Sequence, residues 1–158
     1  MLDVFLTSRF YVTVPRIDYY KDEFKNLKHR VTPSAGIGYE FVRNTFMELD
    51  VSTGAGYQFT ESEDGDTADD FAGTLGIALD FDLPGGSELD NTYGLQAVFT
   101  DLDKTSHHFE SILSVDIWGP LDLDLTFILD RIEKPEEDDG DQPDSNDITV
   151  MAGFSIDF

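Results

Sequence analysis

Residues 147–158 read DITVMAGFSIDF, and this stretch decides the fold class. Successive side chains of a β-strand point to opposite faces, so an apolar residue at every second position marks a strand with one apolar face. Here the residues between the apolar ones are small or polar, apart from Met151. The segment therefore predicts a strand whose apolar face continues to the last residue and comprises Ile148, Val150, Ala152, Phe154, Ile156 and Phe158.

The same alternation recurs along the whole chain, as residues 121–130 (LDLDLTFILD) illustrate. No segment shows the period of a helix. About eight strands of about ten residues, with their connections, would use nearly all of the 158 residues as a single domain. We predict strands at 3–14, 30–42, 45–59, 70–83, 88–100, 107–118, 121–131 and 147–158.

The composition excludes some classes of protein. With 10 basic and 33 acidic residues the formal net charge is -23, which argues against nucleic acid as a partner. No run of about 18 apolar residues is present, so a membrane-spanning helix is not expected. Membrane-spanning strands need no such run, because their apolar residues alternate with polar ones. The first residues show no export signal, so the prediction of export rests on the rest of the chain.

The lengths of the predicted connections alternate. Those at 43–44, 83–86 and 119–120 are short, whereas those at 15–29, 60–69, 101–106 and 132–146 are longer and charged. Outer-membrane barrels have short periplasmic turns and long external loops. We therefore predict an all-β fold, an antiparallel up-and-down transmembrane β-barrel in the bacterial outer membrane, with its last residue on the periplasmic side.

Aromatic residues gather at the predicted strand ends, as they do in the interfacial girdles of membrane barrels. The alternative is a soluble barrel or sandwich whose apolar residues form the core. That alternative does not explain the alternating loop lengths. The predicted girdles are Tyr39, Phe41, Phe46, Phe81, Trp118 and Phe158 at one end, and Phe59, Phe71, Phe99 and Phe109 at the other.

Four short segments of the first third of the chain carry a family resemblance. The order of residues 22–24 (DEF), 35–39 (AGIGY), 47–51 (MELDV) and 54–57 (GAGY) resembles the YdiY-like salt-induced outer membrane proteins, a family of unknown biochemical function. The likeness runs from about Tyr11 to Phe158. Members usually have further strands upstream of the region matching Asp3, which leaves three alternatives: a short member, a trimmed one, or one segment of a larger barrel.

The end of the chain carries a second resemblance. Phe158, preceded by Ile156 and Phe154, is similar to the C-terminal signal by which bacterial outer-membrane barrels are recognised for assembly. The resemblance implies an outer-membrane location, with membrane lipid and the barrel-assembly machinery as partners. It carries across no catalytic residue and no cofactor.

Catalysis is not expected from the histidines. His107 and His108 lie beside Ser106 and upstream of Glu110, so a hydrolase acting on lipid can be imagined. However, no strained-turn motif surrounds the serine, and adjacent histidines in a loop are usually solvated. We predict no catalytic residues and no cofactor.

Two acidic segments, 61–70 and 136–147, could supply oxygen ligands to divalent cations. Neither has the ordered spacing of a calcium loop, and a hydrated external surface is the favoured interpretation. The candidate metal ligands are Asp64, Asp66, Asp138, Asp139 and Asp141.

The predicted inner face is strongly acidic, with Arg9 as its basic residue. A water-filled interior would favour cations, whereas a packed one requires the carboxyl groups to be paired or protonated. An eight-stranded barrel is only just wide enough to be filled by side chains, so a continuous pore is not expected. The acids are Glu40, Glu48, Asp50, Asp80, Glu110, Asp116, Asp122, Asp124 and Asp130.

These features predict a structural, binding or stress-related outer-membrane protein without catalysis. The alternatives are a narrow cation-leaning channel, a lipid-modifying enzyme, and a soluble carrier of an apolar ligand.

Overall fold

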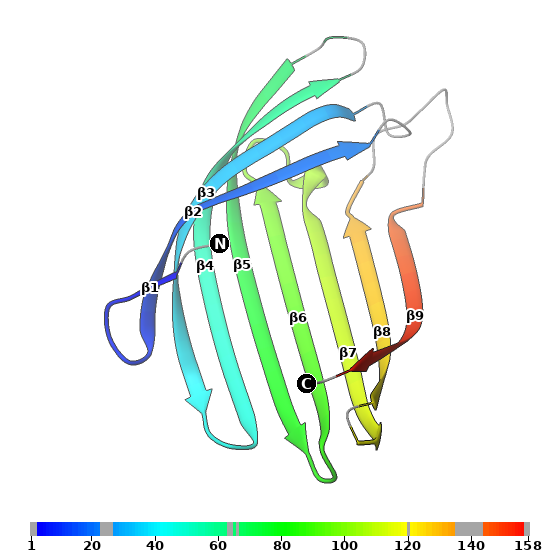
Figure 1. Ribbon diagram of the computed structural model, residues 1–158. Helices are drawn as coiled ribbons and strands as arrows, with labels where there is room; N and C mark the ends of the chain where they lie inside the picture. Colours follow the sequence, from blue (N-terminus) through cyan, green and yellow to red (C-terminus); the bar gives the residue numbers. More distant parts are fainter. Residues whose placement is uncertain are drawn as a thin grey trace.

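The chain folds into one antiparallel β-sheet, whose strands are neighbours in the order of the sequence (Figure 1). The computed structural model describes residues 3–22, 27–62, 65, 67–119, 121–134 and 144–156. The predicted all-β, antiparallel architecture is confirmed. The strands are β1 (Asp3–Phe5), β2 (Phe10–Asp22), β3 (Leu27–Arg43), β4 (Met47–Ser62), β5 (Thr67–Leu83), β6 (Ser87–Val98), β7 (Ser106–Trp118), β8 (Leu121–Ile132) and β9 (Asn146–Ile156).

The connections contain little regular structure. A short 3-10 helix, η2 (Leu102–Lys104), links β6 to β7, and Asp101 caps it by accepting a hydrogen bond from the backbone of Asp103. In the part of the chain that the structure describes, no helix has the length and apolar character needed to cross a membrane.

The prediction of a single strand over 3–14 is wrong. Residues 6–9 form a turn in which the Thr7 hydroxyl accepts hydrogen bonds from the backbone N–H groups of Arg9 (3.3 Å) and Phe10 (2.9 Å). Threonine hydroxyls commonly stabilise turns in this way. The described sheet therefore has nine strands and not eight, and Arg9 lies in an exposed turn and not on the polar face of a strand.

The predicted connection over 15–29 is also wrong, because β2 continues to Asp22 and β3 begins at Leu27. Pro15 lies inside β2, where the register with β3 shifts between Thr13 and Arg16. An irregular position tolerates proline, which has no N–H group to donate to a ladder. Likewise, β4 and β5 extend into the predicted loop over 60–69.

The short connections have the turn chemistry that their residues predict. The Asn44 side chain accepts hydrogen bonds from the backbone N–H groups of Phe46 (2.9 Å) and Met47 (3.1 Å) between β3 and β4. Between β5 and β6, Gly85 and Gly86 have φ values of 98° and 83°, a left-handed conformation that glycine adopts without steric cost. These turns hold the strand ends of β3 to β6 close together.

The polar face of the sheet is its concave face. The Tyr11 hydroxyl donates to Asp50 over 2.5 Å although β3 lies between their strands. Side chains two strands apart start about 10 Å from each other, so they meet only where the sheet curls toward them. Gly38 permits this contact, because a Cβ at that position would lie 2.0 Å from the Tyr11 ring.

A second contact of this kind crosses β5. The Gln96 amide nitrogen donates to the side-chain oxygen of Gln58 over 2.6 Å, and the fully buried Ala72 belongs to the strand between them. The buried side chains of the described residues lie on this concave face, and several are polar. They are Tyr11, Thr13, Thr32, Gln58, Asp70, Ala72 and Val98.

The convex face is apolar and exposed. Its members alternate with the concave residues along each strand, as the sequence predicts, but they pack against no second layer among the described residues. This distribution is the reverse of that in a soluble barrel, where the bulky apolar face is inside. The exposed set includes Ile17, Tyr19, Ile37, Tyr39, Phe71, Leu125, Phe127, Ile148, Val150 and Phe154.

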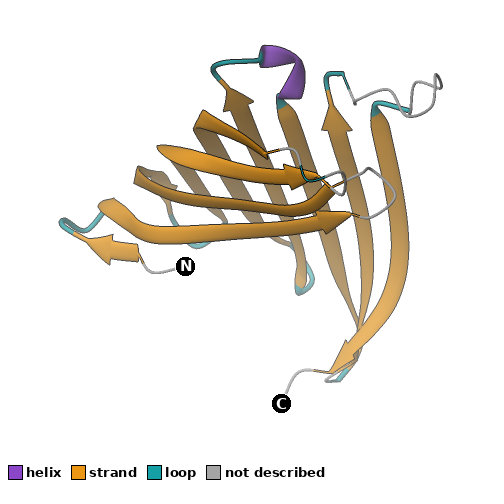
Figure 2. Cartoon of the chain, turned by 90° about the horizontal axis from the view of Figure 1, so that it is seen from above, coloured by secondary structure: helices purple, strands orange, loops and turns teal. Residues whose placement is uncertain are grey.

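The sheet curls strongly but is open between β1 and β9, which are its two edges (Figure 2). The predicted closed ring of a barrel is therefore not formed by the described residues. At the first edge, β1 has three residues and pairs with β2 only at Tyr11 to Thr13. β9, at the other edge, pairs with β8 along its length.

Candidate functional site

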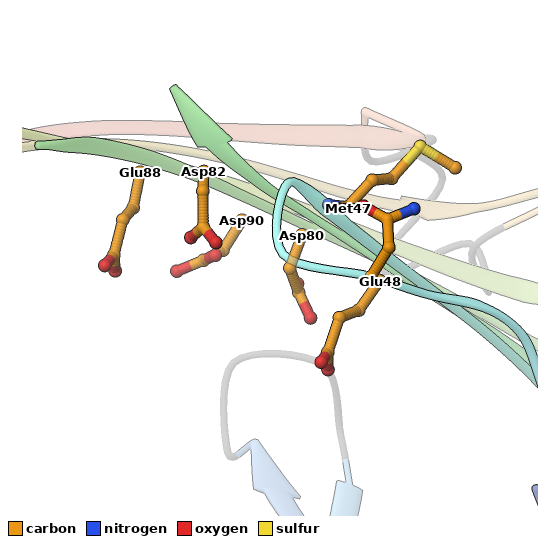
Figure 3. Close-up of a pocket in the computed structure, with 7 residues that line it drawn as sticks. Met47, Glu48, Asp80, Asp82, Glu88 and Asp90 are labelled. Atoms are coloured by element: carbon orange, nitrogen blue, oxygen red, sulfur yellow. Dashed lines mark hydrogen bonds between the residues drawn. The ribbon is translucent and has the colours of Figure 1, made fainter. Parts of the chain in front are cut away.

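The clearest concentration of chemical groups is an acidic hollow on the concave face, at the short-turn ends of β4, β5 and β6. Its volume is about 250 Å³, and it is lined by Asn44, Met47, Glu48, Asp80, Asp82, Glu88 and Asp90. Figure 3 shows the carboxylates extending from one side of the sheet, whereas Met47 extends from the other. We call this hollow, together with the carboxylates that line it, the acidic hollow.

Strand register produces this cluster. Glu48 lies opposite Asp80, and Asp80 lies opposite Asp90 on the next strand. One step nearer the turn, Asp82 lies opposite Glu88. Like charges directly opposite each other in a sheet are destabilising, so this arrangement is not explained by the stability of the sheet. It suits a surface that meets water or cations.

The turn between β5 and β6 allows a further carboxylate to approach. A Cβ at Gly86 would lie 1.9 Å from a carboxylate oxygen of Asp116, a residue of β7. Glycine at this position therefore serves two purposes, because it adopts the positive φ of the turn and leaves room for Asp116.

Arg43 is a basic residue beside the hollow. Its guanidinium lies 3.1 Å from Glu40 and 3.6 Å from Glu48, measured between nitrogen and oxygen. The side chains of Arg43 and Glu48 are 58% and 54% exposed, so solvent screens this pair, and exposed pairs of this kind contribute little to stability. The carboxylates that line the hollow thus outnumber the basic residue beside it.

Carboxylates farther from the short turns are held by individual hydrogen bonds. Asp50 accepts from Tyr11, and Asp124 accepts from the Ser114 hydroxyl over 2.8 Å. Asp70, which is buried, accepts from the Thr100 hydroxyl. Buried polar groups are stable where they have such partners. The acidic inner face thus divides into a hydrogen-bonded part and the acidic hollow.

The two adjacent histidines lie on opposite faces of β7. His108 has Nδ1 2.7 Å from Asp130 and Nε2 3.7 Å from Glu110. His107 has Nδ1 2.8 Å from the Tyr93 hydroxyl and Nε2 3.3 Å from Glu133. Both nitrogens of His108 face carboxylates and neither is directed at a serine, which is not the arrangement of a nucleophile and its base.

The other candidate residues are distributed differently. Asp64, Asp66, Asp138, Asp139 and Asp141, the candidate metal ligands, lie outside the described residues, as does Phe158. Ile156 is the last residue of β9, and Phe154 is exposed on the convex face. Within the described ranges, no three His, Cys, Asp or Glu side chains are grouped as metal ligands.

Sequence reasoning missed the bridges from Tyr11 to Asp50 and from Gln58 to Gln96. Both join strands that are not neighbours, so they depend on how strongly the sheet curls. The available signal was the small residue between each pair, Gly38 in β3 and Ala72 in β5, because only small residues let a side chain pass over them.

A family described as "Protein of unknown function, DUF481" matches residues 1–158. None of the curated proteins and none of the solved structures matches the chain.

Proposed function

The chain belongs to the DUF481 family of proteins of unknown function, and we propose that it is a β-barrel protein, or a barrel segment, of the bacterial outer membrane. Its role in this proposal is structural or binding, without catalysis. The likeness of its first third to the YdiY-like salt-induced outer membrane proteins supports a role in stress. Outer-membrane lipid and the barrel-assembly machinery are its proposed partners.

The observation that carries the proposal is the reversed placement of apolar and polar side chains. Burial of apolar surface contributes about 25 cal/mol per Å², so a wide apolar convex face is unfavourable in water. In a bilayer the same face contacts lipid, and the polar concave face is shielded from it. Trp118, 82% exposed at the short-turn end, suits the membrane–water interface.

Strand length supports the same proposal. A membrane-crossing strand needs about 9–11 residues, and β3 and β5 each have 17. In the proposed orientation these strands cross the membrane and extend beyond it on the long-loop side. The short turns with the acidic hollow then face the periplasm.

A second candidate function is a narrow cation-leaning channel, and the acidic hollow favours it. Rings of carboxylates select cations in channels. The bridges from Tyr11 to Asp50 and from Gln58 to Gln96 fill part of the concave side, so any path for ions is narrow. A soluble carrier of an apolar ligand is disfavoured, since the concave side presents mainly polar and small residues.

Nitroxide labelling tests the proposal, because the chain has no cysteine that would interfere. We expect labels at Leu125→Cys and Phe154→Cys, on the convex face, to collide with oxygen and to be shielded from a water-soluble nickel chelate in lipid vesicles. Thr126→Cys and Thr149→Cys, on the concave face of the same strands, are the matched controls and should show the opposite preference. Equal or reversed preferences would refute the membrane assignment.

A further inference from the structure

The two edges of the open sheet carry backbone groups that a membrane cannot accommodate. β9 has 11 residues and, among the described strands, pairs with β8 alone. On the other side, β1 covers β2 only from Tyr11 to Thr13, so the stretch of β2 from Arg16 to Asp22 has β3 as its one described neighbour. Unpaired amide and carbonyl groups do not occur in hydrocarbon, because nothing there can replace water as their partner.

Strand direction identifies which edges can join. Neighbouring strands are antiparallel throughout, so odd-numbered strands run one way and even-numbered strands the other. β1 and β9 are therefore parallel, whereas β2 and β9 are antiparallel. Outer-membrane barrels are antiparallel throughout with an even number of strands, which favours β2 and not β1 as the partner of β9.

The side chains of these edges also match. On the uncovered part of β2, Ile17 and Tyr19 are 65% and 60% exposed, and on β9, Ile148 and Val150 are 61% and 74% exposed. All belong to the convex apolar face and lie toward the long-loop ends of their strands. Pairing β2 with β9 would continue the apolar face without a break.

The shape of the sheet brings the same segments toward each other. In both views the end of β2 that precedes residues 23–26 extends toward β8 and β9, whereas β1 lies on the far side of the molecule (Figures 1 and 2). The long-loop half of β2 is thus the part of the first edge that faces the last strand.

From these observations we infer that the long-loop half of β2 pairs with β9 of the same chain in the membrane, closing β2 to β9 into a ring. β1 remains outside this ring, at the short-turn end of β2, where it pairs with Tyr11 to Thr13. The inference rests on the proposed membrane function and adds where the barrel closes. We call the pairing of β2 with β9 the seam.

Cysteine cross-linking tests the seam. Ile17→Cys or Tyr19→Cys is combined with Ile148→Cys or Val150→Cys, which gives four double variants that sample neighbouring registers. Each is folded into lipid vesicles and treated with an oxidant or a short bismaleimide. For at least one combination we expect most of the protein to migrate on a denaturing gel as a monomer of altered mobility, which indicates a cross-link within one chain. Reductant should reverse the shift that oxidation produces.

Two matched variants calibrate the experiment. Leu129→Cys with Ile148→Cys joins neighbours in the β8–β9 register and must cross-link. Ile37→Cys with Ile148→Cys joins β3 to β9 and must not. If the four seam variants give only dimers, the edges join two copies and the inference is overturned. If the Leu129 control reacts and no seam variant does, the inference is likewise overturned.

The nitroxide measurement separates the two proposals. Convex labels that report lipid, together with unreactive seam variants, would leave the membrane assignment standing without this seam. Convex labels that report water would refute the membrane assignment itself, and the seam with it.

Discussion

At the scale of single residues, the contact of Tyr11 with Gly38 and Asp50 determines how the concave face is filled. The ring passes over Gly38 to reach Asp50, and a Cβ at Gly38 would meet ring atoms within 2.0 to 2.5 Å. Aromatic rings commonly pack on glycine in sheets, but here the glycine also permits a hydrogen bond to a strand two places away.

Gly38→Ala is therefore expected to destabilise the fold by about 1–3 kcal/mol, the usual cost of overpacking. The added methyl displaces the Tyr11 ring and weakens its bond to Asp50. Urea midpoints in detergent, followed by tryptophan fluorescence, would measure the loss. Gly153→Ala is the matched control, since its Cβ would meet nothing within 4 Å. Equal midpoints for the two variants would contradict this role of Gly38.

Glu133 provides a residue-scale prediction for pH. The hydrogen bond from Arg131 and the positive charge of that residue lower the pKa of Glu133 below its ordinary value of 4.5. A lowered pKa means that the contribution to stability is present above 4.5 and is lost as the pH falls through the value in the folded protein. Because the group is exposed, the effect is small.

We expect the protection factors of amides near Glu133, which are their exchange rates relative to the unstructured chain at the same pH, to fall as the pH is lowered below 4.5, while those in β8 stay constant. Glu133→Gln should lack this pH dependence. An unchanged pH dependence in this variant would show that Glu133 is not its source.

At the scale of elements, η2 and the end of β8 form one corner on the long-loop side. The backbone N–H of Glu133 donates to Thr105 (3.0 Å), and that of Lys134 donates to Asp103 (2.8 Å). The Lys134 ammonium also lies 2.5 Å from the Asp103 carboxylate. The loop between β6 and β7 is thus attached to a strand that is not next to β6.

The last strand carries an element-scale prediction about assembly. Deleting Phe158 should reduce the folded fraction in cells far more than replacing His29, His107 and His108 together by alanine. The deletion removes the end of the apolar face and, by resemblance, part of the assembly signal, whereas the histidines make only local contacts such as that of His29 with Tyr19. Heat-modifiable gel migration measures both variants. Normal migration after the deletion would contradict the assembly role.

At the scale of the whole molecule, the excess of acidic residues determines which solutes can approach. The formal net charge is -23, and in the described residues the acidic hollow concentrates part of it at one end of the concave face. A single-sign lining raises the local concentration of cations and repels anions.

If the barrel conducts, we expect it to prefer cations, and the double variant Asp80→Asn, Asp90→Asn should lower the ratio of potassium to chloride permeability in planar bilayers severalfold. Asp64→Asn, a change in the acidic segment over 61–70, is the control and should leave the ratio nearly unchanged. Absence of conductance in the unaltered protein would refute the channel and leave the structural or binding role.

The sequence by itself determined the strands, because alternation of side chains is a property of each segment. It placed β4 to β9 close to their observed positions and identified the apolar face of each. It missed the turn at 6–9, since Leu6 and Phe10 continue the alternation on either side of Ser8. It also misplaced the connection over 15–29, because Pro15 occupies a register irregularity that only pairing with β3 reveals.

The curl of the tertiary structure bears out the polar face as the inner one. The loop lengths had predicted it, whereas side-chain alternation by itself is the same whichever way a sheet curls. The bridge from Gln58 to Gln96 and the acidic hollow both follow from that curvature and from a register set between strands. The sequence supplied the acids, but their convergence depends on pairing between segments far apart in the chain. Closure likewise depends on the meeting of two edges, which no local pattern encodes.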